Sequence, residues 1–320
     1  MTPIISTDRL TKQYRPPHGP TAVREITLAV EEGEILSLLG RNGAGKTTLI
    51  GLLCGLFPPT SGHALIAGHS IAGEPMAIKR VVGVVPQEIA LYLQLSGRQN
   101  LLYFGQLYGL GGQALERAVA GVLAVIEMSD LADQKVGRLS NGMKRRLNIA
   151  VALLHRPPLL LMDEPTVGLD PDSRRRILDL IMRLKREQGV TVLYATHHMA
   201  EAQEISDRVA IMHEGRIIAL GSPAALIRDI HAPETLCMHV AGDSPPAGLL
   251  DALRQMANVQ QVSQHYGNVT MSLVNTSRVL PDILRTAEQL GADIQTLTVA
   301  QPSLEAVFLR LTGENLEVTP

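Results

Sequence analysis

The 320-residue sequence is poor in aromatic residues and cysteines and has almost no net charge. Aromatic residues make up 3% of the chain and tryptophan is absent, so rings on which single-stranded nucleic acids stack are scarce. The 29 basic and 31 acidic residues give a formal net charge of −2, whereas nucleic-acid-binding proteins usually carry a basic excess. Cys54 and Cys237 are too few for a disulfide framework or a four-cysteine zinc site. We therefore expect no nucleic-acid partner and two reduced thiols.

Long hydrophobic runs are also missing. The longest apolar run, Ile149–Leu154, is far shorter than the ~20 residues that span a bilayer. Near the N-terminus, Asp8 and Arg9 stand where a secretory signal peptide needs an apolar core. The sequence therefore predicts a soluble chain that does not insert into a membrane.

The distribution of charge divides the chain into two parts. Residues 1–229 hold 25 basic and 22 acidic residues, a net charge of +3, whereas residues 230–320 hold 4 and 9, a net charge of −5. Gly221, Ser222 and Pro223 have the composition of a loop close to this change. Because domains usually contain about 100–200 residues, we predict two domains, 1–229 and 230–320.

Short apolar segments alternate with helical patterns in the first part. We predict four buried strands, at Glu34–Leu39, Arg80–Val85, Pro158–Asp163 and Val190–Thr196. We predict three helices, at Gly45–Leu56, Asn141–His155 and Pro171–Gln188. The alternation indicates an α/β fold with a mostly parallel central sheet. A terminal hairpin follows, formed by Arg208–Met212 and Arg216–Leu220.

The second part has a different order of elements, β-α-β-β-α-β and a final helix. The expected segments are Thr235–Ala241, Gly248–Met256, Val259–Gln264, Asn268–Val274, Ser277–Leu290, Asp293–Val299 and Ser303–Leu311. This order predicts a small α+β domain of the ferredoxin-like type. We find no chemical motif in it.

A phosphate-binding motif follows the first predicted strand. Gly40–Thr47 matches G-x-x-x-x-G-K-[ST] between a strand and a helix, which is the context that this motif requires. The glycines let backbone N–H groups converge on phosphate oxygens, while Lys46 supplies a positive charge and Thr47 an oxygen ligand for Mg²⁺. The flanking strand and helix argue against a chance glycine-rich turn. The residues expected to bind the nucleotide here are Gly40, Asn42, Gly43, Ala44, Gly45, Lys46, Thr47 and Thr48.

Two carboxylates, Asp163 and Glu164, end a later apolar strand. Such a pair provides one ligand for Mg²⁺ and one group that polarises a water molecule. Solvated acids at a strand end are common in isolation, but the accompanying phosphate loop favours the catalytic interpretation. A further segment, Leu139–Arg146, begins a helix, and spacing alone does not distinguish a binding role for Ser140 from an N-cap.

Together these motifs resemble those of the ATP-binding subunits of ATP-binding-cassette (ABC) transporters. Seven elements over about 220 residues carry the resemblance. They are Tyr14 (adenine-stacking aromatic), Gly40–Thr47 (Walker A), Pro86-Gln87 (glutamine loop), Ser140–Met143 (signature), Leu160–Glu164 (Walker B), Gly168–Asp170 (D-loop) and Thr196-His197 (histidine switch).

The resemblance implies that two chains sandwich two ATP molecules head to tail. Each nucleotide would lie between Walker A of one chain and the signature helix of the other, with Ser140, Gly142 and Asp170 among the binding residues. Glu164 would orient the attacking water and His197 would contact the γ-phosphate. The resemblance also implies Mg²⁺, held by Thr47, Asp163 and Gln87.

Three of these assignments have ordinary alternatives. Tyr14 could be a surface tyrosine, and Gln87 could be an ordinary loop residue. His197 could cap the helix that begins near Met199, or form a metal pair with His198, although adjacent histidines do not share a face of a helix or strand.

The signature departs from the family pattern at two positions. Met143 stands where glutamine is usual, and together with Lys144, Arg145 and Arg146 it resembles the branch that serves type-2 exporter permeases. Asn141 replaces a glycine, and its side chain could either crowd the γ-phosphate or donate a hydrogen bond to it. We expect ATP turnover to survive, since the principal catalytic residues are present. The C-terminal region, 230–320, resembles the accessory domain of drug and sodium exporters, and its segment Gln301–Leu309 resembles a recurring tail of such subunits. The domain would act in dimer contact or regulation, or would be a passive appendage.

The resemblance therefore implies an ATPase that dimerises on ATP and powers export through a separate membrane permease. It would be a homodimer on the cytoplasmic face of the inner or plasma membrane. Two other classes of protein fit the sequence less well. A cassette ATPase of translation or DNA repair usually carries two cassettes or an inserted coiled coil, and neither is present. A regulatory protein with an inactive site is disfavoured by the intact Asp163-Glu164 pair.

Overall fold

The computed structural model describes residues 3–229, 234–242, 244–273, 276–300 and 303–312. Contacts divide the chain into two compact units, Met1–Pro223 and Ala224–Pro320. Helix α8 (Pro223–Asp229), which the predicted boundary at 229/230 assigns to the first domain, falls almost entirely in the second unit because its contacts are made there. Residue 230 itself lies outside the described residues. Among the described residues, no helix combines the length and hydropathy that crossing a bilayer requires.

A six-stranded sheet forms the centre of the first unit. Its order is β10-β9-β3-β8-β7-β6, with neighbouring strands parallel except for the β9–β10 hairpin at one edge. The strands are β3 (Ile35–Leu39), β6 (Val82–Val85), β7 (Leu159–Asp163), β8 (Thr191–Thr196), β9 (Arg208–His213) and β10 (Arg216–Gly221). The predicted α/β fold and its hairpin are confirmed. The predicted strand Arg80–Val85 begins too early, because Arg80 and Val81 form the last turn of α2 (Pro75–Val81), where a basic residue favours the helix C-terminus.

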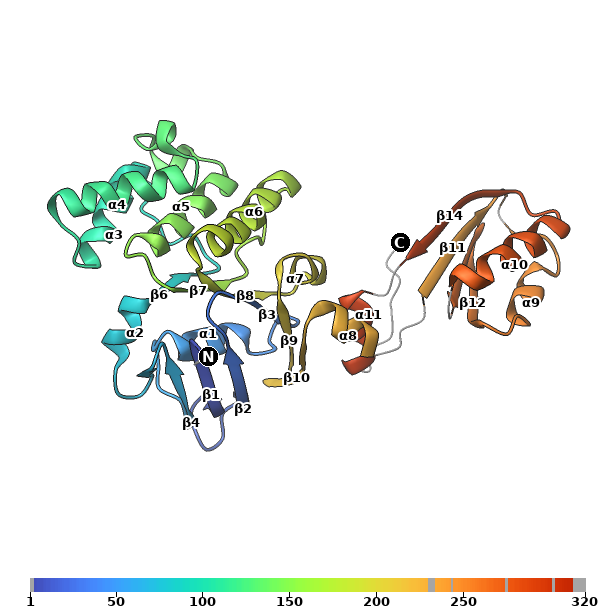
Figure 1. The fold of residues 1–320 in the computed structure, drawn as a ribbon, viewed down its shortest axis with the longest axis horizontal. Helices are drawn as coiled ribbons and strands as arrows, with labels where there is room; N and C mark the ends of the chain where they lie inside the picture. The colour runs from blue at the N-terminus through green and yellow to red at the C-terminus, as the bar shows by residue number, and fades with distance from the viewer. Residues whose placement is uncertain (1–2, 230–233, 243, 274–275, 301–302, 313–320) are drawn as a thin grey trace. The chain divides into compact units, whose positions relative to one another are not determined.

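A second, antiparallel sheet was not predicted. It has the order β2-β1-β4-β5 and comprises β1 (Ile5–Gln13), β2 (Thr21–Val30), β4 (Ser61–Ile66) and β5 (His69–Ser70). Helix α1 (Lys46–Leu53) lies between this sheet and the central one (Figure 1). The buried side chains of Leu49, Ile50, Leu52 and Leu53 join both sheets into one hydrophobic core.

Four long helices share a core with the other face of the central sheet, two of them packed on its strands and two packed on another helix (Figure 1). They are α3 (Gly97–Leu107), α4 (Gly112–Val125), α5 (Asn141–Leu153) and α6 (Pro171–Gln188). Two short 3₁₀ helices, Ser129–Leu131 and Val136–Arg138, precede α5, and α7 (Met199–Ile205) follows β8. Strand β7 separates the two cores: Leu160 and Met162 pack with the four helices, whereas Leu159 and Leu161 pack with α1.

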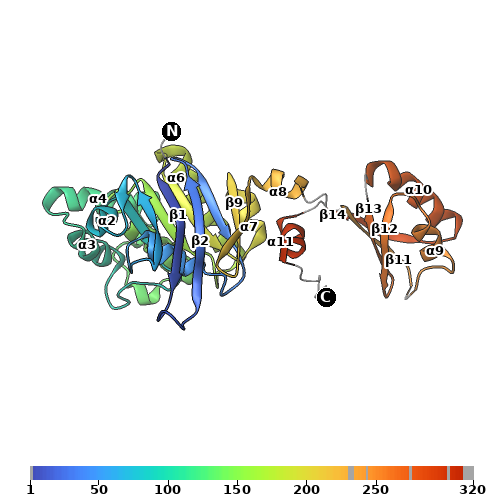
Figure 2. The same cartoon turned by 90° about the horizontal axis from the view of Figure 1, so that it is seen from below.

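The second unit contains the predicted βαββαβ arrangement. An antiparallel sheet of order β12-β13-β11-β14 is formed by β11 (Glu234–Val240), β12 (Val259–His265), β13 (Asn268–Leu273) and β14 (Ile294–Ala300). Helices α9 (Leu249–Arg254) and α10 (Thr276–Gln289) lie beside it (Figure 2), and their apolar faces complete its core. The predicted final helix is α11 (Leu304–Thr312). Val274, Gln301 and Pro302 of the predicted elements lie outside the described residues.

Candidate active site

The loop between β3 and α1 is shaped by glycines. Gly43 and Gly45 have φ angles of 84° and 104°, a left-handed region that favours glycine. A Cβ atom at Gly45 would lie 2.1 Å from the carbonyl oxygen of Ala22, and one at Gly40 would lie 2.4 Å from that of Met212. Any larger residue at Gly40 or Gly45 would therefore displace a neighbouring backbone segment.

The Lys46 side chain folds back over this loop and is only 5% exposed. Its Nζ donates hydrogen bonds to the carbonyl oxygens of Gly40, at 2.7 Å, and Arg41, at 3.2 Å. It also forms an ion pair with Glu164 Oε1 at 3.2 Å. The ammonium group is thus held at the centre of the loop, between backbone dipoles and a buried carboxylate.

Asp163 is buried at the end of β7, beside the same loop. Burial raises the pKa of its carboxyl group above the ordinary value, and the hydrogen bond from the Thr47 hydroxyl opposes this rise. Among the described residues, no group forms a hydrogen bond with Asp163 Oδ1, although this oxygen is buried. A buried carboxylate oxygen without a donor, next to a hydroxyl, is a suitable oxygen ligand for a divalent cation.

Glu164 has a strained backbone, and its carboxylate contacts two side chains. Its φ angle of 45° is left-handed, which costs a non-glycine residue roughly 1–2 kcal/mol. Its N–H donates to the carbonyl oxygen of Ala195 in β8 at 2.9 Å, and this bond holds the turn against the sheet. The carboxylate is placed between Lys46, on Oε1, and the Nδ1 atom of His197, 2.9 Å from Oε2. Because His198 is the residue before α7, His197 does not cap that helix.

These residues surround a pocket of about 290 Å³. It is lined by Ala22, Asn42, Gly43, Gly45, Lys46, Thr47, Thr48, Gln87 and Glu164. Tyr14 follows β1 and is 39% exposed, with its hydroxyl 3.3 Å from Thr48 Oγ1. Ala44 and Gly40, also predicted to bind nucleotide, do not line the pocket, and the Ala44 carbonyl accepts a hydrogen bond from Gly215. The structure thus brings most of the predicted Walker A residues to one pocket together with Gln87 and Glu164, whereas Asp163, His197 and Tyr14 do not line it.

Arg145 connects the signature helix to the glutamine loop, a contact that the sequence analysis missed. Its guanidinium donates to the carbonyl oxygens of Pro86, at 2.7 Å, and Gln87, at 2.5 Å. The side chain is buried, and burial lowers the pKa of Arg145. Gln87 itself is exposed, so its position depends on a backbone held from α5.

The signature residues lie at a different groove, of about 230 Å³. Ser140 is the N-cap of α5, and its Oγ accepts a hydrogen bond from the Met143 N–H at 3.2 Å. The capping role that the sequence left open is therefore present. Gly142 is buried against α6, and Asn141 is exposed. Asp170 caps α6 by accepting from the Ser173 N–H at 2.9 Å, a bond that lowers the pKa of its carboxyl group.

A buried acidic residue, Glu201 of α7, was also missed. Its carboxylate accepts hydrogen bonds from Tyr194 at 2.7 Å and from the Thr166 hydroxyl at 2.8 Å to Oε2 and 2.9 Å to Oε1. Arg174 of α6 completes its surroundings with an ion pair at 3.4 Å. The run Arg174–Arg176 suggests a helix face exposed to solvent, but Arg174 pairs with a buried carboxylate.

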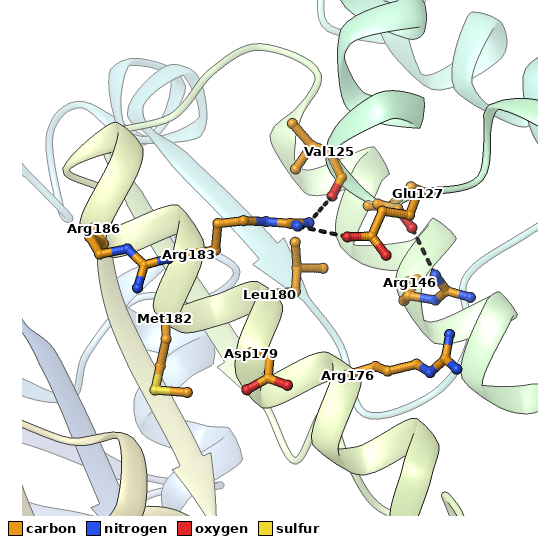
Figure 3. A pocket seen from close by; sticks show the side chains of 10 residues that line it. Val125, Glu127, Arg146, Arg176, Asp179, Leu180, Met182, Arg183 and Arg186 are labelled. Atoms are coloured by element: carbon orange, nitrogen blue, oxygen red, sulfur yellow. Dashed lines mark hydrogen bonds and ion pairs between the residues drawn. The ribbon is translucent and has the colours of Figure 1, made fainter.

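A second pocket, of about 400 Å³, lies between α4 and α6 and is lined by arginines (Figure 3). Arg183 donates to the Val125 carbonyl and to Glu127, and Arg146 donates to the Ile126 carbonyl at 2.9 Å. These carbonyls belong to the C-terminus of α4, where positive side chains satisfy unpaired acceptors. Helix capping accounts for two of the arginines here.

Comparison with known proteins places these motifs in one family. Residues 23–167 match the family described as ABC transporter. The chain is 39% identical to the linearmycin resistance ATP-binding protein LnrL of Bacillus subtilis (strain 168), over 98% of this chain and 99% of that protein. It is 34% identical to the doxorubicin resistance ATP-binding protein DrrA of Mycobacterium tuberculosis (strain H37Rv), over 92% and 90%. It is 38% identical to the Nod factor export ATP-binding protein I of Burkholderia lata, over 92% and 93%.

Solved structures resemble a large part of this chain. A dimeric post-hydrolysis state of the ATP-binding cassette MJ0796, bound to ADP and Pi, superposes with a TM-score of 0.62 at 27% identity, over 68% of this chain and 98% of that one. The cbiO1 protein from Clostridium perfringens, part of the ABC transporter complex cbiONQ, gives a TM-score of 0.64 at 28% identity, over 72% and 95%.

Proposed function

The chain belongs to the ABC transporter family, and from that premise we propose that it binds and hydrolyses ATP as a dimer to power export through a separate membrane permease. One observation carries this proposal. Lys46, Glu164 and His197 converge beside the glycine loop, with Glu164 3.2 Å from the Lys46 ammonium and 2.9 Å from the His197 ring. A phosphate-binding cation and a carboxylate that can orient water are thus adjacent.

Positioning and electrostatic stabilisation account for most of the catalysis of phosphoryl transfer. Lys46 and the loop N–H groups would bind the β- and γ-phosphates, with the N-terminus of α1 adding a favourable dipole. Glu164 would orient the attacking water from its fixed turn. His197, which contacts Glu164, would reach the γ-phosphate, and Tyr14 would stack on the adenine.

We propose Mg²⁺ as the cofactor. The Thr47 hydroxyl and the Oδ1 atom of Asp163, which has no hydrogen-bond donor among the described residues, fit a small cation that prefers oxygen ligands. Gln87 lines the pocket beside Thr47. When bound, Mg²⁺ would neutralise charge on the phosphates. Burial disfavours the ionised form of Asp163. A cation bound at this site would offset that effect by stabilising the carboxylate.

We propose that two copies pair head to tail. Ser140 and Gly142 line a groove separate from the Walker A pocket of the same chain, so one chain presents two different half-sites. The N-terminus of α5 at Ser140 would face the γ-phosphate bound by the other copy. The dimeric state of the similar cassette MJ0796 supports this arrangement.

We propose the class of permease and of cargo from the names of the relatives. Proteins named for linearmycin and doxorubicin resistance and for Nod factor export favour a type-2 exporter permease and an organic small-molecule cargo. The chain would then lie at the cytoplasmic face of the inner or plasma membrane, held there by its permease.

We propose an accessory role in dimer contact or regulation for residues 230–320. The core of the second unit is drawn from residues 236–299, whereas the two cores of the first unit are drawn from residues 4–217. A chain that ends at Asp229, and so lacks residues 230–320, tests the proposal. Reduced dimerisation or transport in that variant would support the accessory role, and unchanged behaviour would favour a passive appendage.

Two substitutions test the proposed activity. Glu164→Gln keeps the size of the side chain but removes its negative charge, so ATP should be retained without turnover and should trap a dimer detectable by size-exclusion chromatography with light scattering. Lys46→Ala, as the control, should weaken ATP binding and leave a monomer. A monomeric Glu164→Gln variant at saturating Mg-ATP, or recovery of the purified chain with ribosomes or DNA instead of a membrane protein, would contradict the proposal.

A further inference from the structure

Glu201 lies at the centre of a buried polar network behind the active-site pocket. It is 3% exposed, and its partners Thr166, Tyr194 and Thr196 are equally inaccessible. Buried polar groups are rarely left without hydrogen bonds, and the Glu201 carboxylate has partners from the turn after β7, from β8 and from α6. None of these partners lines the nucleotide pocket. The network therefore has no direct part in binding.

Two of its partners belong to segments that carry active-site residues. Thr166 lies two residues after Glu164, and its hydroxyl lies 2.9 Å and 2.8 Å from the two Glu201 oxygens. Thr196 directly precedes His197, and its Oγ1 lies 3.4 Å from Glu201 Oε2 while accepting from the His198 N–H at 2.9 Å. One carboxylate thus contacts the chain on both sides of the Glu164–His197 hydrogen bond.

The turn that contains Glu164 needs such support. Its left-handed φ of 45° is unfavourable, so the surrounding contacts must hold it. The bond from the Glu164 N–H to Ala195 fixes one end of the turn, and the Thr166–Glu201 bond fixes the other. Without the second bond, the Glu164 carboxylate could move away from His197.

We propose that Glu201 is a positioning residue for hydrolysis. Through the Thr166 hydroxyl it holds the Glu164 turn, and through Thr196 it aligns the segment bearing His197. Glu201 does not line the nucleotide pocket, so its effect on hydrolysis is exerted through these two neighbours. This inference rests on the proposed ATPase function.

Substitutions at Thr166 test the proposal in the full-length chain. Thr166→Val removes the hydroxyl at nearly constant volume and should lower kcat for ATP at least tenfold, with KM and the affinity for a fluorescent ATP analogue changed less than twofold. Thr166→Ser restores the hydroxyl and should keep kcat within threefold of the wild type. Tyr194→Phe removes a different bond to Glu201, so it should lower the melting temperature while changing kcat less than Thr166→Val does.

A double-mutant cycle separates positioning from general stability. If Thr166 and Glu201 act as one unit, Thr166→Val combined with Glu201→Gln should reduce kcat no more than the worse single variant. Normal turnover by Thr166→Val, equally slow Thr166→Ser, or additive effects in the cycle would overturn the proposal. Absence of hydrolysis by the wild-type chain would overturn the ATPase function together with this inference, whereas wild-type turnover with an unimpaired Thr166→Val variant would overturn this inference alone.

Discussion

Gly142→Ala should destabilise the cassette even without nucleotide, because α5 and α6 approach too closely for a side chain at this position. A Cβ atom at Gly142 would lie 2.3 Å from Ser173 Oγ and 2.7 Å from Ser173 Cβ, well inside van der Waals contact. Overpacking of this kind costs about 1–3 kcal/mol, and the higher helix propensity of alanine returns up to about 1 kcal/mol. The expected loss is about 1–2 kcal/mol, or roughly 2–8 °C in Tm for a unit of this size.

The matched control removes the atoms that clash. Ser173→Gly eliminates the Oγ and Cβ atoms but keeps the backbone N–H group, which donates a hydrogen bond to the Asp170 carboxylate. In the Ser173→Gly background, Gly142→Ala should therefore be neutral or stabilising. Thermal and urea unfolding of the four proteins without nucleotide provide the measurement. Equal losses in both backgrounds, or a Gly142→Ala variant that melts at the wild-type temperature, would refute the packing argument.

Three further substitutions test separate parts of the site. Arg145→Lys cannot keep the two-pronged contact with Pro86 and Gln87, so urea unfolding should show a loss of about 1.5–3 kcal/mol; unchanged stability would contradict the role of this contact. Asp163→Asn should raise Tm at pH 7, because the raised pKa of Asp163 means that its ionised form destabilises the fold as pH rises through the folded pKa. That gain should disappear below about pH 4, where the acid is protonated in both states, and a lower Tm at pH 7 would count against it. Tyr14→Ala should weaken ATP binding by about 1–3 kcal/mol while Tyr14→Phe retains it, as measured with a fluorescent analogue; equal weakening would exclude stacking.

The parallel sheet and the phosphate loop could be predicted because their signals are contiguous in sequence. Gly40–Thr47 contains its own strand-to-helix context, and Asp163 and Glu164 are neighbours at the end of an apolar strand. The antiparallel sheet was missed for a physical reason. Arg9 and Glu25 adopt positive φ angles in β1 and β2, and the register shifts near them break the two-residue alternation that identifies a strand.

The buried charged residues Arg145 and Glu201 could not be predicted, because their partners are far apart in the chain. Arg145 is 59 residues from Pro86, and Glu201 is 35 residues from Thr166. Local sequence gives both the appearance of ordinary exposed helix residues. The groove that contains Ser140 and Gly142 could not be predicted from the spacing of residues in the sequence either, because it forms where the starts of α5 and α6 meet.

Strand β7 has a property that links the Glu164 turn to both cores of the first unit. Four of its five residues are apolar and point alternately into two cores, so the pattern of hydrophobic side chains does not distinguish one alignment of the strand from the next. Its alignment must then be set at its ends, where Pro158 accepts from Thr191 and the Glu164 N–H bonds to Ala195. A shift of one residue would carry both carboxylates about 3.3 Å along the sheet. The turn that presents Glu164 thus also fixes the alignment of the strand. A residue inserted into β7 would displace the two carboxylates, and so would abolish the proposed hydrolysis, at a smaller disturbance than the one that unfolds the core.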